Sequence, residues 1–154
     1  MINETISTEL GMGQLISDTF THKLVNKLFP YEFNRRGKLI AVMALHIYMK
    51  ENGDMKIVHD DDNGRRSIHI FIEFEDTDGD TYYIDQNGIH TSAQMMQLLY
   101  AKEKCSKIKI EPFSINSLRL SETPYYEDTE AFKAANKISI ILKDVLGEWT
   151  GVVQ

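Results

Sequence analysis

The clearest pattern of hydrophobic and polar positions lies between Ser67 and Tyr100. Ile68, Ile70, Ile72 and Phe74 alternate with mainly polar residues, and this period of two predicts a strand with one face in a core. Residues 76–80 supply turn residues, including a glycine that tolerates positive φ. Residues 81–84 then predict a returning strand, and Thr91 or Ser92 predicts the start of a helix after a tight loop at residues 85–88.

This hairpin has a chemical consequence. A turn at residues 76–80 places Glu75 opposite Thr81, Glu73 opposite Tyr83 and Phe71 opposite Asp85. His69 then becomes a diagonal neighbour of Asp85 on the same face of the sheet. A histidine beside a carboxylate is the base and orienting group of a catalytic triad, without its nucleophile. On spacing alone, two ordinary strand residues are the preferred interpretation.

The first half of the chain predicts helices. Apolar residues at spacings of three and four predict an amphipathic helix over residues 12–29, after a polar arm or short turn at residues 1–11. Residues 38–50 are more apolar and predict a central, mostly buried helix, with Gly53 as its C-terminal stop. Residues 55–59 alternate and predict a strand.

The second half predicts further strands and helices. A helix over residues 92–103 precedes a strand over residues 106–111, where lysines at alternate positions suit a sheet edge. A short strand is expected at residues 118–120. A long helix opens at Asp128 or Thr129 and stops at Gly147, with Trp149 folded back onto the body.

These elements predict an α+β fold in one domain spanning residues 1–154. The expected architecture is a small, mostly antiparallel sheet, packed by the central apolar helix and by flanking helices on one side. With 42% hydrophobic and 26% charged residues, the chain has the composition of a globular protein.

The charge and hydropathy of the chain argue against several classes of function. A net charge of −6 argues against binding nucleic acid, which needs clustered Lys and Arg. No apolar run approaches the ~20 residues that span a bilayer, and the first residues show no secretory signal. Cys105 is the single cysteine, so no internal disulfide forms. A cytoplasmic location is expected, with no membrane contact.

The central helix followed by this hairpin resembles papain-like and transglutaminase-like folds, as found in small bacterial and phage proteins. The resemblance covers roughly residues 35–102. The matching positions run from the strand histidine to the start of the next helix: His69, Ile70, Ile72, Gly79, Tyr83-Ile84-Asp85 and Gly88-Ile89-His90-Thr91. It implies that His69 and Asp85 occupy the family's catalytic histidine and aspartate positions, beside the apolar helix.

The chain departs from this family where the nucleophile belongs. The start of the central helix reads Asn34-Arg35-Arg36-Gly37-Lys38, with no Cys, Ser or Thr. A lone His69–Asp85 pair has nothing to activate there. Arg35 and Arg36 would instead place positive charge beside the strand face, so that they, Glu73, Tyr83 and His90 become candidate binding residues.

Two metal interpretations compete with structural ones. The turn 76–80 has its glycine at the fourth position, not the sixth that an EF-hand loop requires, so a hairpin turn is preferred over a calcium loop. His69, Glu73, Asp85 and His90 have the ligand types of a zinc or iron site, but no dense signature is present. We therefore expect no metal and no cofactor.

Three functions follow. The first is a non-catalytic protein-interaction module on a cysteine-protease-like or transglutaminase-like scaffold, such as a phage accessory or anti-defence protein that binds and inhibits a host protein. The second is a hydrolase that uses His69 and Asp85 with a non-cysteine nucleophile or a metal-bound water. The third is a structural subunit or homodimer. The missing nucleophile favours the first, and with it a protein partner.

Overall fold

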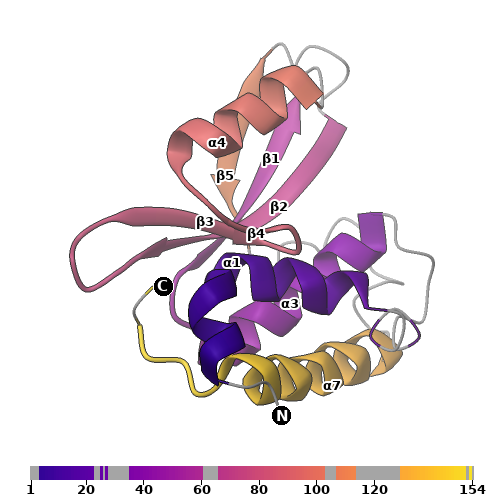
Figure 1. Cartoon of the computed structure of the whole chain (residues 1–154). Coiled ribbons are helices and arrows are strands. Elements are labelled where there is room, and N and C mark those ends of the chain that lie inside the picture. The colour runs from indigo at the N-terminus through magenta and orange to yellow at the C-terminus, as the bar shows by residue number, and fades with distance from the viewer. Residues whose placement is uncertain are drawn as a thin grey trace.

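The computed structural model of the chain describes residues 4–22, 25, 27, 35–60, 66–102, 107–113, 129–151 and 153. It is an α+β fold with a five-stranded antiparallel sheet in the order β4-β3-β2-β1-β5 (Figure 1). The fold class and the antiparallel sheet are therefore confirmed. The strands are β1 (Asp54–Asp60), β2 (Arg66–Glu75), β3 (Thr81–Asp85), β4 (Gly88–His90) and β5 (Ile108–Pro112). The helices are α1 (Glu4–Thr21), α3 (Arg35–Tyr48), α4 (Ser92–Gln97), the π-helix η2 (Leu98–Lys102) and α7 (Thr129–Leu146).

Helices cover both faces of the sheet. Ile70, Ile72 and Phe74 of β2 enter a large core with α1, α3 and α7. Phe71 points the other way and packs with Met95 and Leu99 of α4 and η2. In Figure 1, α4 lies in the upper half of the view and α1, α3 and α7 lie together in the lower half, on the other side of β3 and β4. The expectation of helices on one side was wrong, because the strands bury apolar side chains on both faces.

The central helix α3 is buried as predicted, but it ends differently. Its middle residues 40–45 are at most 4% exposed. The helix ends at Tyr48, and Lys50 and Glu51 adopt positive φ values of 55° and 60°. The N–H of Glu51 donates to the carbonyl of His46 over 2.8 Å and closes the last turn. Gly53 is therefore not the helix stop: it has φ +82° and leads into β1.

Two other helix predictions were wrong at their boundaries. α1 begins at Glu4, where an arm was expected, and Gly11 breaks its geometry with φ 71° and ψ 161°. It ends at Thr21, short of the predicted residue 29. The helix predicted over residues 92–103 is six residues of α-helix followed by a π-helical turn. Thr91 caps it in a capping box with Gln94, as the cap prediction required.

The C-terminal predictions that fall on described residues are confirmed. β5 is an edge strand, and α7 begins at Thr129 and ends just before Gly147, which has φ +81°. Trp149 is 7% exposed and packs edge-to-face on Phe74, with ring centroids 5.0 Å apart. The predicted strand at residues 118–120 and Cys105 lie outside the described residues.

Candidate functional site

The hairpin of β2 and β3 has the predicted register. Glu75 lies opposite Thr81 and Glu73 opposite Tyr83. Its turn is built around Asp76, whose Oδ1 accepts the N–H groups of Asp78 and Asp80 over 3.0 and 3.1 Å. The acidic segment is a hydrogen-bonded turn, as the sequence predicted.

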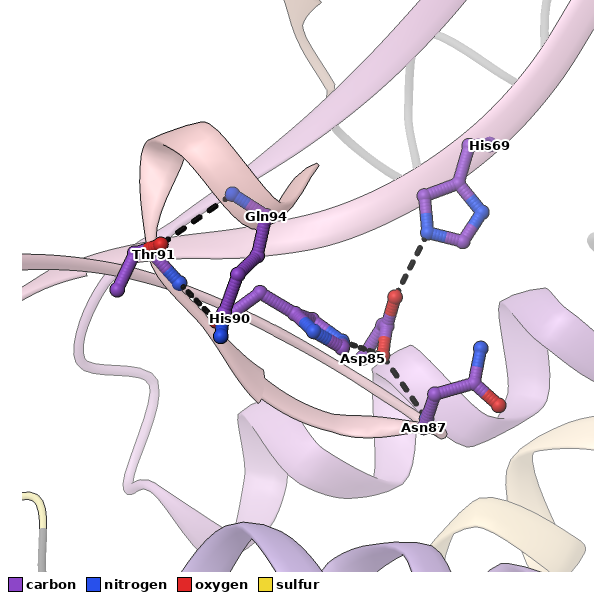
Figure 2. Close-up of polar contacts among 6 residues, drawn as sticks. All are labelled: His69, Asp85, Asn87, His90, Thr91 and Gln94. Carbon is purple, nitrogen blue, oxygen red and sulfur yellow. Dashed lines mark hydrogen bonds and ion pairs between the residues drawn. The ribbon is translucent and has the colours of Figure 1, made fainter. Parts of the chain in front are cut away.

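Asp85 lies at the centre of a cluster of polar side chains (Figure 2). His69 Nε2 lies 2.8 Å from Oδ2 of Asp85, and His90 Nε2 lies 2.8 Å from Oδ1. The backbone N–H of Asn87 also donates to Oδ1, over 2.8 Å. The His69–Asp85 contact predicted from the register is therefore present, and a second histidine completes the cluster. We call His69, Asp85 and His90 the His–Asp–His cluster.

Sheet geometry explains why two histidines reach one carboxylate. Asp85 ends β3, which lies between β2 and β4. His90 of β4 lies opposite Tyr83, two residues before Asp85. His69 of β2 lies two residues before Phe71, which the register places opposite Asp85. Each histidine is thus a diagonal neighbour of Asp85, on the strand to either side.

A close backbone contact holds β4 in place. Gly88 opens β4 with φ +122°, and a Cβ there would lie 2.6 Å from the carbonyl oxygen of Gly13 in α1. Only glycine accepts both the positive φ and this approach. The contact between α1 and β4 therefore fixes the strand that carries His90.

The Asp85 carboxyl is ionised. Its side chain is 0% exposed, and burial alone would raise its pKa. The hydrogen bonds from His69 and His90, with the Coulombic attraction of both imidazoles, outweigh burial and lower its pKa from 3.8 to about 2. Since an ionised carboxylate only accepts hydrogen bonds, both histidines must carry a proton on Nε2.

His69 is left with one unsatisfied atom. Its Nδ1 is buried and has no hydrogen-bond partner in the described part of the chain. When the ring is neutral and Nε2 carries its proton, Nδ1 is a bare acceptor. Among the residues that the structure describes, no hydroxyl or thiol lies within hydrogen-bond reach of Nδ1, where a triad would place its nucleophile.

The cluster is also closed to substrate. The side chains of His69 and Asp85 are 2% and 0% exposed, and that of His90 is 16% exposed. His69, Phe71 and Asp85 lie on the face of the sheet that α4 covers. The alternate residues of the same strands, such as Ile70 and Ile84, point to the opposite face and pack in the core with α3. The sheet therefore separates the pair from the helix that would carry a nucleophile in the resembling families.

Of the other predicted site residues, Tyr83 lies directly opposite His90 of the cluster. Glu73 and Tyr83 face each other across β2 and β3, and Tyr83 packs edge-to-face on Phe71 at 5.0 Å. Both are half-buried. The side chains of Arg35 and Arg36 lie outside the described residues. Within the described part of the chain, no group of three His, Cys, Asp or Glu side chains is placed to hold a metal ion.

Comparisons with protein-family models, curated proteins and solved structures find no match to this chain. The resemblance to papain-like and transglutaminase-like folds therefore stays a prediction. Among the described helices, none has the length and apolar character that a membrane span requires.

Sequence reasoning missed two contacts at this site, one local and one between distant segments. The bond from the Asn87 N–H to Asp85 follows a familiar signal, because Asp often binds the N–H two residues later in a turn. The approach of Gly13 to Gly88 has no local signal, although two glycines in α1 were a hint that a backbone comes close.

Proposed function

We propose that this chain is a non-catalytic protein-interaction module. The observation that supports this most is the closure of the His–Asp–His cluster. Asp85 accepts hydrogen bonds from His69, His90 and the Asn87 N–H, and the side chains of His69 and Asp85 are 2% and 0% exposed. A catalytic base has to reach the proton that it removes, whereas a buried hydrogen-bond network holds strands together.

In this proposal the cluster is a clasp for three strands. His69, Asp85 and His90 come from β2, β3 and β4, and each hydrogen bond joins two neighbouring strands. A charge-assisted bond contributes about 1.5–3 kcal/mol, against about 1 kcal/mol for a neutral one. The partner protein then binds the outer surface of the sheet and its helices, and not the cluster itself. That the partner is a host protein inhibited by a phage accessory protein stays a prediction.

The test compares the wild-type chain with His69→Gln and with a surface control, Asp78→Asn. Each protein is immobilised at equal density and exposed to lysates of candidate hosts, and any stoichiometric partner is then purified and titrated. The module proposal expects folded His69→Gln to bind this partner with an affinity within about threefold of wild type.

The alternative of a hydrolase makes the opposite prediction. If His69 is a catalytic base, His69→Gln abolishes a turnover that wild type and Asp78→Asn share, typically by 10²-fold or more. Finding such a turnover, or finding no stoichiometric partner in any host lysate, would contradict the module proposal. Circular dichroism of each variant ensures that lost function is not lost folding.

A further inference from the structure

The strongest surface feature outside the cluster is a groove between α3 and α7, which pack side by side (Figure 1). The groove has a volume of about 200 Å³. Its apolar lining includes Ile47 and Tyr48 from α3, Ile140 from α7, and Trp149 beyond α7. It is smaller than the ~300–1,000 Å³ of small-molecule sites, so its size suits one or two side chains.

Two isoleucines are left in solvent at this groove. Ile140 is 67% exposed and Ile47 is 36% exposed. The described residues contain four exposed large hydrophobic side chains, and these two line one groove. Apolar side chains that gather at one place on a surface mark an interaction site more often than scattered ones do.

The charges around the groove differ in sign from those of the whole chain. The charged side chains that line the groove are two lysines and one carboxylate: Lys50, Lys143 and Glu148. The chain as a whole has 17 basic and 23 acidic residues. The groove is thus a locally basic surface on an acidic protein, and it favours an acidic partner.

One carboxylate already shows how the rim binds acidic groups. Glu148 lies 2.8 Å from Lys143 Nζ and 3.6 Å from Lys50 Nζ. All three side chains are more than half exposed, at 58% for Glu148, 60% for Lys143 and 65% for Lys50. Such exposed pairs are weak and are screened by solvent, so a carboxylate of a partner can compete for the two lysines.

Resting on the proposed function, we propose that the α3–α7 groove is the docking site for an acidic segment of a partner protein. The segment places an aliphatic side chain between Ile47 and Ile140, against Trp149. Its flanking Asp or Glu side chains pair with Lys50 and Lys143. The hydrophobic contact supplies most of the affinity, and the charges set the choice of partner.

The probe for the test is a synthetic acetylated hexapeptide of sequence Glu-Glu-Leu-Leu-Asp-Glu, and its matched control replaces each acidic residue by Lys. Trp149 is the only tryptophan in the chain, so its fluorescence and its indole N–H signal report on the groove directly. The expected result is a saturable change with the acidic peptide and at least tenfold weaker binding of the basic one.

Protein variants locate the binding. Ile140→Asp should weaken the acidic peptide at least tenfold, because it removes apolar contact and adds a like charge. Ile110→Asp is the matched control, since Ile110 is another exposed isoleucine, on β5, at 37% exposure, and it should leave binding unchanged within twofold. Equal binding of both peptides, equal effects of both variants, or no saturable change up to about 5 mM peptide would overturn the proposal.

Different results would contradict the groove assignment and the interaction-module proposal. If a stoichiometric partner binds wild type and Ile140→Asp equally, the groove assignment is wrong and the module stands. If no partner exists, the module itself is wrong. A dimer of this chain that dissociates with Ile140→Asp would assign the groove to a second copy and overturn the acidic partner.

Discussion

Replacing Asp85 by Asn tests the clasp with almost no change in shape. The asparagine carbonyl can take only one of the two carboxylate positions. The carbonyl oxygen preserves more hydrogen bonds at the Oδ1 position than at the Oδ2 position, because at Oδ1 it accepts from both His90 Nε2 and the Asn87 N–H. Its amide nitrogen then points at His69 Nε2, which in the wild type carries a proton. Two donors face each other, so His69 must move its proton to Nδ1.

This tautomer change leaves a buried donor without a partner, because Nδ1 of His69 has none in the wild type. An orphaned buried donor costs about 1–3 kcal/mol, and the change of the two remaining bonds from charge-assisted to neutral adds about 1 kcal/mol. We therefore expect Asp85→Asn to lower the free energy of unfolding by about 2–4 kcal/mol at pH 7. That is a large part of the 5–15 kcal/mol typical of a domain.

The pKa of Asp85 leads independently to a similar figure. It is lowered from 3.8 to about 2 in the folded chain, which corresponds to about 2 kcal/mol of stability above pH 4. Because the folded pKa is the lower one, this stability is fully present above pH 3.8 and is lost as the pH falls towards 2. The difference between wild type and Asp85→Asn should therefore shrink over this window.

Urea unfolding at pH 7, 5 and 3 measures these differences, with Asp78→Asn as the control for removing an exposed carboxylate. The control should stay within about 0.5 kcal/mol of wild type. Long-range ¹H–¹⁵N spectra should show His69 as the Nε2–H tautomer in the wild type and as the Nδ1–H tautomer in Asp85→Asn. If Asp85→Asn is as stable as the control at pH 7, the cluster is not a clasp.

Three further substitutions have sharp expectations. Gly88→Ala should lower the free energy of unfolding by more than about 2 kcal/mol, because the new Cβ would lie 2.6 Å from the Gly13 carbonyl oxygen. The control is Gly151→Ala, which has φ +79° and open space and should cost only the ~1 kcal/mol of backbone strain. Equal losses of stability for the two variants in urea unfolding would refute the contact. Tyr48→Phe removes a 2.9 Å hydrogen bond to the Gly147 carbonyl and should cost about 1 kcal/mol. Burial and the charge of Glu148 raise the pKa of Tyr48 from 10.0 to about 12, so wild-type stability should fall as the pH rises from 10 to about 12; a fall of the same size in Tyr48→Phe would contradict this. Thr91→Ala breaks the capping box and should cost about 1 kcal/mol by thermal unfolding, whereas no loss would mean that the cap contributes nothing.

The His69–Asp85 contact could be predicted because it depends on one turn. Once residues 76–80 form the turn, the strand period places every later pair, and the two side chains become diagonal neighbours. His90 required a second step. β4 must turn back beside β3 and stay there, which depends on the approach of Gly13 in α1 to Gly88. That contact joins residues 75 positions apart, and no local pattern shows it.

The helix ends show the same limit. Gly53 was a reasonable stop for α3, since glycine accepts positive φ at no steric cost. In the structure Lys50 and Glu51 take positive φ instead, and the helix closes three residues earlier. Gly53 is needed elsewhere, because a Cβ there would lie 2.8 Å from Cγ2 of Ile72. The strand across from the turn, and not the helix, determines where the glycine is required.

The largest difference concerns which helix faces the histidine, and its signal was present in the strands. Alternation shows that His69, Phe71 and Asp85 share a face, but not what covers that face. Phe71 is the apolar residue among polar ones on that face of β2, and it is fully buried. A strand with large apolar side chains on both faces needs cover on both, and Met95 and Leu99 supply it, four residues apart on α4 and η2. Because α4 takes this face, α3 packs on the other one, and the sheet stands between His69 and the helix start where a nucleophile was sought. The absence of Cys, Ser or Thr at residues 34–38 is therefore of no consequence to His69.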